Sequence, residues 1–252
     1  MKNIYSFLIL ALISVHMYAF ENGSSLIDQA NEAYQTGDYN SALQKYEQLL
    51  NEGYNSADLY YNLGNTYFRL NQPGSAILYF EKAALLEPGD KDIIHNLEVV
   101  KKTLPDQLDV ISDFFVLEWW DETRNICSPT QWAVIGLLLL WAGIGGLVLW
   151  FRGKNRQARK QGFVAGIVLL LLSILPFALG FSAAQYQKDS QKAVIMVEQV
   201  NLKSAPDEVS EDLMELHEGT CLQILDEIGE WKKIRLSNGE EGWLETKVLE
   251  KI

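Results

Sequence analysis

The stretch YYNLGNTYFRLNQPGSAILYFEKAALLEPGD, residues 60–90, decides the fold of the N-terminal half of the chain. Small and aromatic residues recur at helical spacing through two segments, and Asn71 to Gly74 breaks the pattern between them. Shifted by 34 residues, the stretch aligns with an earlier one, in which Ala42 lies over Ala76. The chain is therefore expected to contain repeated pairs of helices that cross at small residues.

This pattern resembles the tetratricopeptide repeat. Residues 57–90 match all eight signature positions, with Tyr60 in place of tryptophan; residues 23–56 match more weakly, and 91–104 predict a capping helix. Because each helix pair leaves an apolar face, about three units are usually needed. We expect the repeat array, residues 23–104, to pack against its own juxtamembrane segment or against a second protein for stability. The predicted packing positions are Ala30, Ala42, Tyr46, Leu63, Gly64, Tyr67, Ala76, Phe80, Ala83 and Pro88.

In the tetratricopeptide family the first helix of each repeat lines a concave groove. Tyr61 and Phe68 would then be either anchors of a recognition surface or packing residues against a neighbouring helix. The carboxylate clamp of one subgroup is absent, because Ile27, His95 and Val99 stand where its cations would be. The acidic groove is expected to take a basic or apolar segment of a partner protein. Its predicted lining is Asn31, Tyr34, Tyr61, Asn65, Phe68, Arg69 and His95.

Two apolar runs, 131–151 and 163–184, are each long enough to cross a bilayer core of about 30 Å. Ser128-Pro129 provides an N-cap and a first-turn proline for the first span. Glycines in that span permit close packing on the second, where Pro176 should kink the helix. The alternative is a pair of buried helices in a soluble core.

The net charge of −12 is unevenly distributed. Residues 20–131 carry a net −11 and 185–252 a net −7, while the loop 152–162 carries five bases and no acid. This distribution argues against nucleic acid as a partner, and the positive-inside rule places the loop in the cytoplasm. The bases that set this topology are Arg152, Lys154, Arg156, Arg159 and Lys160.

Residues 1–20 resemble an export signal, with a basic start at Lys2, an apolar stretch and a plausible cleavage point at Ala19. Met17 is large for such a site, so an uncleaved anchor is the alternative. Either way the chain is expected to be a two-pass protein of the bacterial inner membrane, with both large regions in the periplasm.

Residues 106–127 place Leu108, Ile111, Phe115 and Trp119 on one helical face. This pattern predicts an amphipathic juxtamembrane helix at the outer surface of the membrane. The alternative, equally compatible with the residues, is that the helix caps the repeat array.

Residues 193–252 change to short alternating runs separated by turns, which predicts a small β-barrel. Val200 to Lys203, Gly219-Thr220, Gly242-Trp243 and the hairpin signal Asn238-Gly239 resemble bacterial SH3-like domains. In that family such modules bind peptides or cell-wall glycopeptide, or act as spacers. The predicted barrel core is Leu222, Ile224, Trp231, Ile234, Leu236 and Trp243.

Residues suited to catalysis are scattered along the sequence. The three histidines belong to different regions, and the sequence has no phosphate-cradling glycine loop or metal-spaced cluster. We therefore expect no catalytic residue, no metal and no cofactor. Cys221 is predicted on the solvent side of its strand, and a disulfide with Cys127 in an oxidising space is the alternative to two free thiols.

The order of parts along the whole chain resembles the BatE family of the aerotolerance (Bat) operon: a multidomain membrane protein with an all-α repeat, two transmembrane helices and an all-β SH3-like barrel. The resemblance implies partners from that operon, namely membrane proteins with von Willebrand factor A domains and, indirectly, a MoxR-type ATPase. It also implies a role in aerotolerance or oxidative stress. The expected function is a non-enzymatic scaffold; the alternatives are a peptidoglycan-binding sensor acting through the SH3-like domain and an exported redox enzyme.

Overall fold

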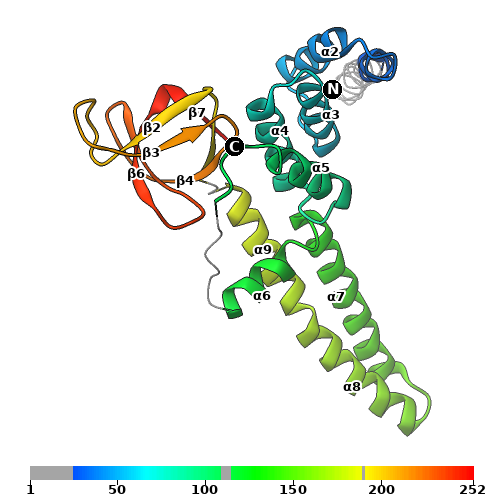
Figure 1. Ribbon diagram of the computed structural model, residues 1–252. Helices are drawn as coiled ribbons and strands as arrows, with labels where there is room; N and C mark the ends of the chain where they lie inside the picture. Colours follow the sequence, from blue (N-terminus) through cyan, green and yellow to red (C-terminus); the bar gives the residue numbers. More distant parts are fainter. Residues whose placement is uncertain (1–24, 109–114, 189–190) are drawn as a thin grey trace, which may run out of the picture.

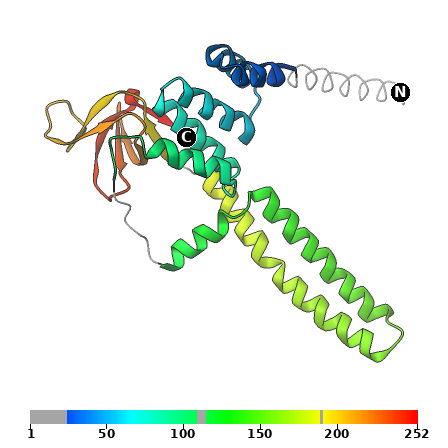
Figure 2. The ribbon, with the colours of Figure 1, turned by 45° about the vertical axis from the view of Figure 1, so that its right-hand side comes forward.

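The computed structural model describes residues 25–108, 115–188 and 191–252, so the export signal expected at 1–20 lies outside the described residues. Helical repeats and a β-sheet lie next to each other at one end of a long helical hairpin (Figures 1 and 2). The fold is therefore an all-α repeat, a pair of long apolar helices and an antiparallel sheet, in that order along most of the chain.

The repeat region begins with a helical segment at residues 25–35. Gly37 and Asn71, which are 34 residues apart, take positive φ values of 84° and 60° at equivalent turns between paired helices. Asp38, Ser56 and Asp90 accept hydrogen bonds from backbone N–H groups at the starts of the helices that follow them. The helices are α2 (Tyr39–Asn51), α3 (Ala57–Arg69), α4 (Pro73–Leu86) and α5 (Lys91–Lys101).

Small residues set the crossing of α3 and α4. A Cβ added to Gly64 would lie 2.7 Å from a ring carbon of Phe80, so only glycine permits this approach. Of the predicted packing positions, Pro88 is half-buried, and the others are buried: Ala30, Ala42, Tyr46, Leu63, Gly64, Tyr67, Ala76, Phe80 and Ala83.

The C-terminal sheet supports the repeat array. On β1, Val194 is fully buried in the core of the repeats, while its neighbours Ala193 and Ile195 are fully buried in the core of the sheet. Leu104, just after α5, also packs into the repeat core. The repeat array was expected to pack against the juxtamembrane segment or a second protein. In the structure β1 packs against the repeat core instead, because both faces of this strand are apolar.

The segment after the repeats differs from its prediction. The helix expected over 106–127 is shorter: residues 106–108 are not helical, and α6 spans Phe115–Arg124. Leu108 packs against the sheet core. The Trp120 indole N–H donates to Ser182 Oγ at 3.3 Å, which fixes α6 to the last helix of the hairpin. Ile111 of the predicted apolar face lies outside the described residues.

The hairpin has two arms: α7 (Pro129–Arg152), and α8 (Arg156–Leu172) continued by α9 (Ile174–Lys188). Ser128 caps α7 in a reciprocal capping box with Gln131. The second arm breaks at Ser173, three residues before Pro176. A proline ring inside a helix clashes with the preceding turn, so the break follows from this residue.

Glycines join α7 to α8. A Cβ added to Gly146 would lie 2.8 Å from the backbone of Gly166, and one added to Gly162 would lie 2.7 Å from the Gly146 carbonyl oxygen. Gly143 meets Leu170 in the same way, whereas Gly145 faces open space. The glycines of α7 except Gly145 therefore pack on α8 and α9. Their partners Gly162 and Gly166 were not predicted from the sequence.

Among the described residues, seven strands form one antiparallel sheet in the order β3-β2-β6-β5-β4-β1-β7. The buried core differs from its prediction, because Trp243 lies between the buried Gly242 and Leu244 and so points to the opposite face. Trp231 is also only half-buried. The strands are β1 (Lys192–Ile195), β2 (Gln199–Lys203), β3 (Asp212–His217), β4 (Cys221–Ile228), β5 (Trp231–Arg235), β6 (Glu241–Glu245) and β7 (Leu249–Lys251).

The β5–β6 turn is one residue longer than the two-residue hairpin that Asn238-Gly239 predicted. Leu236 N–H donates to Glu240 O at 2.9 Å, and Gly239 N–H donates to Leu236 O at 3.0 Å. Only Gly239 of this loop has positive φ, at 82°. This is a three-residue loop with glycine at the left-handed position.

Candidate functional site

The first helices of the repeats are joined by asparagines. Asn31 Oδ1 accepts from the Tyr46 hydroxyl at 2.6 Å and from Asn62 Nδ2 at 3.5 Å. Asn96 Nδ2 donates to Asn65 Oδ1 at 2.8 Å and to the Tyr61 hydroxyl oxygen at 3.0 Å. These bonds use polar atoms of the predicted groove to hold neighbouring helices together.

The predicted aromatic anchors differ in their surroundings. The Tyr61 ring is half-buried, with its centroid 5.8 Å from that of Phe80, so packing explains it. Phe68 retains 36% of its surface and Val99 retains 37%. The open part of the groove, here called the groove surface, consists of Phe68, Arg69, His95 and Val99, all of which are exposed.

Tyr34 and Arg69 both contact Tyr39. The Tyr34 and Tyr39 rings pack edge to face at 5.3 Å, and the Arg69 guanidinium lies 4.8 Å from the centroid of Tyr39. A cation over a ring face is stabilised by the ring quadrupole. The groove was predicted to be acidic from its sequence, and Arg69 places one positive charge in it.

A buried ion cluster joins the repeats to the sheet. Glu81 on α4 is 6% exposed, and its carboxylate lies 2.6 Å from Lys101 Nζ and 3.6 Å from Lys192 Nζ. Burial alone would raise the pKa of Glu81, but Lys192 and Lys101 together hold that pKa below its ordinary value. Glu81 therefore links α4, α5 and β1 as a carboxylate.

Cys221 lies beside this cluster, with its Sγ 3.8 Å from Glu81 Oε1. The prediction that Cys221 faces solvent is wrong, because this face of β4 packs on the repeat core. Burial raises the pKa of its thiol to about 12. Both Cys127 and Cys221 are free, and a protonated, buried thiol is a poor nucleophile.

A second polar cluster lies at the other side of the junction. Asp106 accepts hydrogen bonds from the backbone N–H of His217 at 2.7 Å and from the Thr220 hydroxyl at 2.6 Å, and it lies 2.8 Å from His217 Nδ1. Gly74 N–H donates to Glu218 Oε1 at 3.0 Å. The β3–β4 turn is thus held both by α4 and by the segment that follows α5.

These junction residues were not predicted from the sequence. Glu81 interrupts the apolar pattern of α4 directly after Phe80, and a charge at such a position is a signal of a buried ion pair. Lys192 and Asp106 carried no comparable signal, since each lies in a polar stretch whose contacts depend on how the sheet docks.

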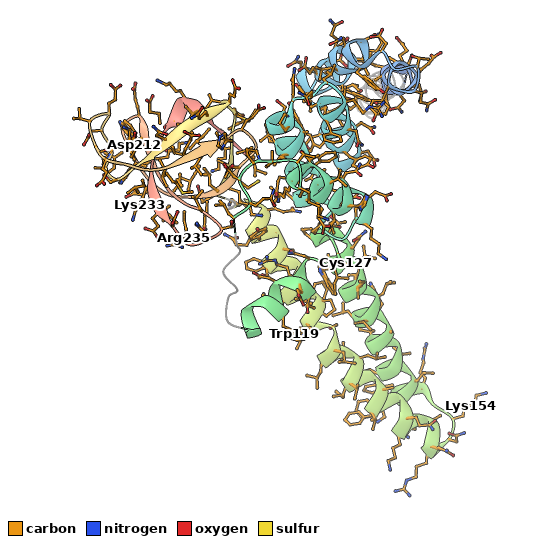
Figure 3. The ribbon with its side chains drawn as sticks, in the orientation of Figure 1. Trp119, Cys127, Lys154, Asp212, Lys233 and Arg235 are labelled. Atoms are coloured by element: carbon orange, nitrogen blue, oxygen red, sulfur yellow. The ribbon has the colours of Figure 1, made fainter. Side chains whose placement is uncertain are left out.

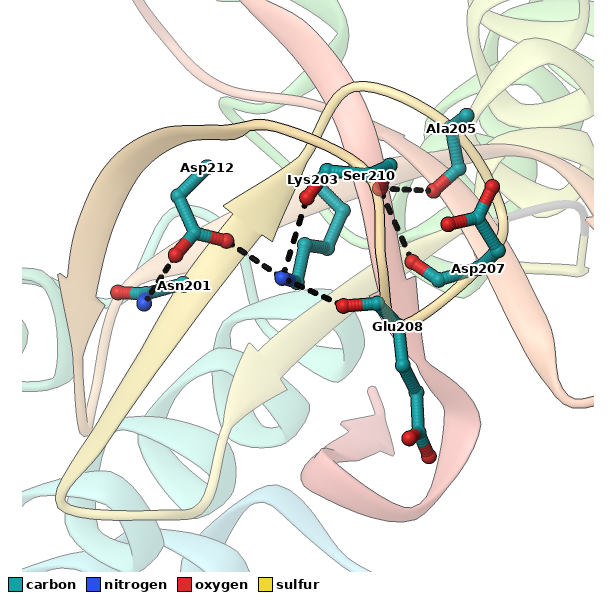
Figure 4. Close-up of polar contacts among 7 residues, drawn as sticks. All are labelled: Asn201, Lys203, Ala205, Asp207, Glu208, Ser210 and Asp212. Carbon is teal, nitrogen blue, oxygen red and sulfur yellow. Dashed lines mark hydrogen bonds and ion pairs between the residues drawn. The ribbon is translucent and has the colours of Figure 1, made fainter.

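The SH3-like signature at Val200 to Lys203 fixes a loop. Lys203 Nζ lies 2.6 Å from Asp212 Oδ1 and donates to the carbonyl oxygens of Glu208 and Ser210 (Figure 4). Asn201 Nδ2 donates to Asp212 Oδ2 at 2.9 Å. These side chains close the loop between β2 and β3 and leave Val209 96% exposed at its tip.

The basic loop lies at the far end of the hairpin. Figure 3 shows Lys154 at the tip that is remote from the repeats and the sheet, whereas Cys127 lies at the near end. Arg159 Nε donates to Trp150 O at 3.1 Å across the turn. The remaining topology bases, Arg152, Arg156 and Lys160, are exposed there as well.

Comparisons with known proteins confirm two of the resemblances. The model of the tetratricopeptide repeat family matches residues 27–92, and that of the bacterial SH3 domain matches residues 198–250. The chain thus contains a tetratricopeptide-repeat region and a bacterial SH3 domain, an architecture associated with protein interaction. No curated protein matches the chain.

Two solved structures resemble the fold distantly. "Crystal structure of MamA" is 17% identical with a TM-score of 0.34, and covers 69% of this chain and 85% of its own. "Crystal structure of MamA protein" is 19% identical with a TM-score of 0.31, and covers 67% of this chain and 89% of its own. TM-scores this low do not show that these proteins share the overall fold of this chain.

The described residues contain no group of three or more metal-ligating side chains. Tetratricopeptide repeats are typically non-enzymatic interaction domains. The arrangement is suited to holding protein surfaces in fixed positions.

Proposed function

We propose that the protein is a non-enzymatic membrane scaffold whose groove surface docks a partner protein on the outer side of the bacterial inner membrane. The observation that carries this proposal is that the groove contains both hydrogen-bonded polar side chains and exposed apolar ones. Its polar atoms bond neighbouring helices, yet Phe68 and Val99 stay exposed on a framework held by Asn96 and Glu81. Exposed apolar side chains on a rigid frame are typical anchors of a binding surface.

The hairpin supplies the membrane anchor in this proposal. Within the described residues, two helices are long and apolar enough to cross a membrane: Pro129–Arg152, and α8 with α9 over Arg156–Lys188. Most of their large apolar side chains face outward, with Leu138 65% and Phe181 74% exposed. A core helix of a soluble protein would bury such residues.

The basic loop supports the orientation. Five bases at the far tip of the hairpin would stay in the cytoplasm by the positive-inside rule, so the repeats and the SH3 domain would both be periplasmic. A cysteine introduced at Lys154 should react with a membrane-impermeant maleimide only after the inner membrane is opened. Labelling in intact spheroplasts would reverse the orientation.

The partner class in this proposal rests on the BatE resemblance. It favours a Bat-type complex of membrane proteins with von Willebrand factor A domains, with a MoxR-type ATPase reached indirectly across the membrane, and a role in aerotolerance or oxidative stress. The hairpin would hold this chain beside the partner's own membrane helices.

The test is affinity purification of the full-length, detergent-solubilised protein with mass spectrometry. Phe68→Ala/Val99→Ala removes exposed side chains of the groove surface and leaves the Tyr61–Asn96 bond in place. The matched control, Val209→Ala/Leu213→Ala, removes exposed apolar side chains from the SH3 domain. Recovery of specific membrane proteins should fall about tenfold in the first variant, as the loss of a hot spot predicts. Equal recovery in both variants would overturn the groove as the docking site.

The second candidate function is binding of peptidoglycan by the SH3 domain. The exposed Val209 and Leu213 lie on the loop and strand at one edge of the sheet, away from the repeats. Retention of the intact protein on purified cell wall, lost in Val209→Ala/Leu213→Ala and kept in Phe68→Ala/Val99→Ala, would favour this function over the scaffold.

A further inference from the structure

A cavity of about 630 Å³ lies where the repeats, the hairpin and the SH3 domain meet. The last turn of α4 contributes Leu85 and the turn after it Pro88. The segment before α7 contributes Ile126, α9 contributes Tyr186, and β1 contributes Lys192. Cavities of this size in proteins commonly hold small molecules or parts of larger ones.

Ile126 of the lining precedes Cys127, which lies at the end of the hairpin opposite the basic loop that Lys154 marks (Figure 3), so the cavity is at that end. Tryptophan indole groups gather at this end. Trp132 Nε1 donates to Arg124 O at 3.0 Å, Trp120 bonds to Ser182, and Trp119 is 60% exposed. Tryptophans are enriched at the level of lipid headgroups, so a hairpin that spans the membrane places the cavity at that level.

The lining combines apolar surface with charges of both signs. Ile94 and Ile126 are 40% and 62% exposed. Lys91 and Glu122 are exposed and form no ion pair with any described residue, and Lys192 shares the Glu81 carboxylate with Lys101. Cations and an unpaired acid beside apolar side chains match an amphiphile whose head carries both charges.

We propose that this junction cavity binds the phosphoethanolamine headgroup of a phospholipid in the outer leaflet. The phosphate would lie beside Lys91 and Lys192, the ammonium beside Glu122, and the glycerol and first methylenes beside Ile94 and Ile126. The inference rests on the proposed membrane function, because only a membrane-spanning hairpin brings the cavity to lipid.

The site gives the lipid a structural role. The side-chain amide of Gln187 on α9 donates to Leu85 O, and Arg124 lies 4.1 Å over the ring of Tyr186. A headgroup bound between these contacts would touch the repeats, the hairpin and β1 at once. Binding would therefore fix the groove surface at a set height above the membrane.

The experiment is native mass spectrometry of the full-length protein in mild detergent, with added phosphatidylethanolamine or phosphatidylglycerol. Phosphatidylethanolamine should be retained about tenfold better, and Lys91→Ala/Glu122→Ala should lower its retention about tenfold, as loss of charge-assisted hydrogen bonds predicts. The control variant, Glu245→Ala/Lys247→Ala, removes an ion pair from the SH3 domain and should retain lipid unchanged. Equal retention of both lipids, or of phosphatidylethanolamine by both variants, would overturn the proposal.

A variant that fills the cavity tests whether the lipid needs this space to bind. Ala84→Phe, at a position that lines the cavity, should also lose phosphatidylethanolamine, and unchanged retention would count against the site. Glycerophosphoethanolamine and inorganic phosphate serve as separate probes. Stabilisation of the protein by either one equal to that by the whole lipid would replace the membrane lipid with a soluble phosphate compound as the occupant.

Extraction separates the two proposals. A protein released from membranes by alkaline carbonate without detergent would overturn the membrane scaffold and this inference with it. A protein that needs detergent but retains no phosphatidylethanolamine would overturn this inference alone.

Discussion

Helices α4 and α7 are both rich in apolar residues, but they bury opposite kinds of side chain. In α4 the large residues Ile77, Leu78 and Phe80 are buried, whereas in α7 the buried residues are Gly136, Gly143 and Gly146. The large apolar side chains of α7 face outward. In water the hydrophobic effect drives large side chains inward, while in lipid it is absent and close backbone packing takes its place. The outward-facing side chains of α7 are thus what the proposed membrane span predicts, whereas α4 buries its large side chains as a helix in water does.

The largest loss of stability is expected from a substitution in α4. Phe80→Ala removes a fully buried ring that fills the space beside Gly64, and it should cost about 3–5 kcal/mol of the free energy of unfolding. Denaturant titration of the full-length protein in detergent, followed by circular dichroism, measures it. Leu138→Ala, at a 65% exposed position of α7, is the control and should cost about 0.5 kcal/mol or less in detergent. Similar losses in both variants would mean that α7 packs as a core helix.

The junction gives the next effect. Glu81→Ala leaves Lys101 and Lys192 without their shared carboxylate. It should cost about 2–3 kcal/mol, because charge-assisted hydrogen bonds to a buried carboxylate are lost while the two lysine side chains, 42% and 41% exposed, can still be solvated. The same titration measures this loss. Glu245→Ala breaks a pair with Lys247 near the surface of the SH3 domain and should cost about 1 kcal/mol or less. If Glu81→Ala were equally mild, the ion cluster would contribute little to the contact between the repeats and the SH3 domain.

The sequence predicted the parts of this molecule better than their contacts. The period of 34 and the turn residues Gly37 and Asn71 follow local rules of helix packing and backbone conformation, so the repeats were visible in advance. The docking of β1 was not, although the run Ala193-Val194-Ile195-Met196 is continuous and apolar, as expected of a strand buried on both faces. That signal shows that a second surface covers the strand, but not which one.

The groove shows the same limit. The spacing placed Tyr61 and Phe68 on one helical face, and the repeat family implied a groove there. Whether each ring packs or stays open depends on Asn96 and Phe80, which come from the next helices along the chain. Tertiary contacts of this kind are not encoded in local periodicity.

A substitution at a packed glycine of α7 should have a smaller effect on stability. Gly146→Leu places a side chain where even a Cβ would lie 2.8 Å from the Gly166 backbone, so α7 and α8 must separate; the cost is about 1–3 kcal/mol. Thermal unfolding of the full-length protein in lipid nanodiscs measures it. Gly145→Leu is the neighbouring control, since a Cβ there meets nothing within 4 Å. If both variants were equally stable, the glycines would not form the helix contact.

The smallest effect is the pH dependence of the Asp106–His217 contact. The hydrogen bond to Asp106 raises the pKa of His217 above its ordinary value of 6.5, with Glu215 at 3.3 Å adding to the shift. Burial opposes ionisation of Asp106, but Thr220 and His217 hold its pKa below the ordinary 3.8. The histidine contribution to stability is therefore complete below pH 6.5 and is lost as pH rises through the raised pKa. The carboxylate contribution is present above pH 3.8 and is lost as pH falls through the lowered pKa.

The SH3 domain should thus be held to the segment after α5 most tightly in mildly acidic solution, between those two limits. The unfolding free energy of the wild type should decline from pH 6 to pH 9, and His217→Gln should flatten that decline while leaving any slope below pH 5 in place. His95→Gln is the matched control, because it makes the same substitution at an exposed histidine of the groove surface. A decline that persisted in His217→Gln would assign the titration to another group. The interface would then depend on the Glu81 cluster and the two-sided burial of β1, whose charges and apolar contacts do not change in this range.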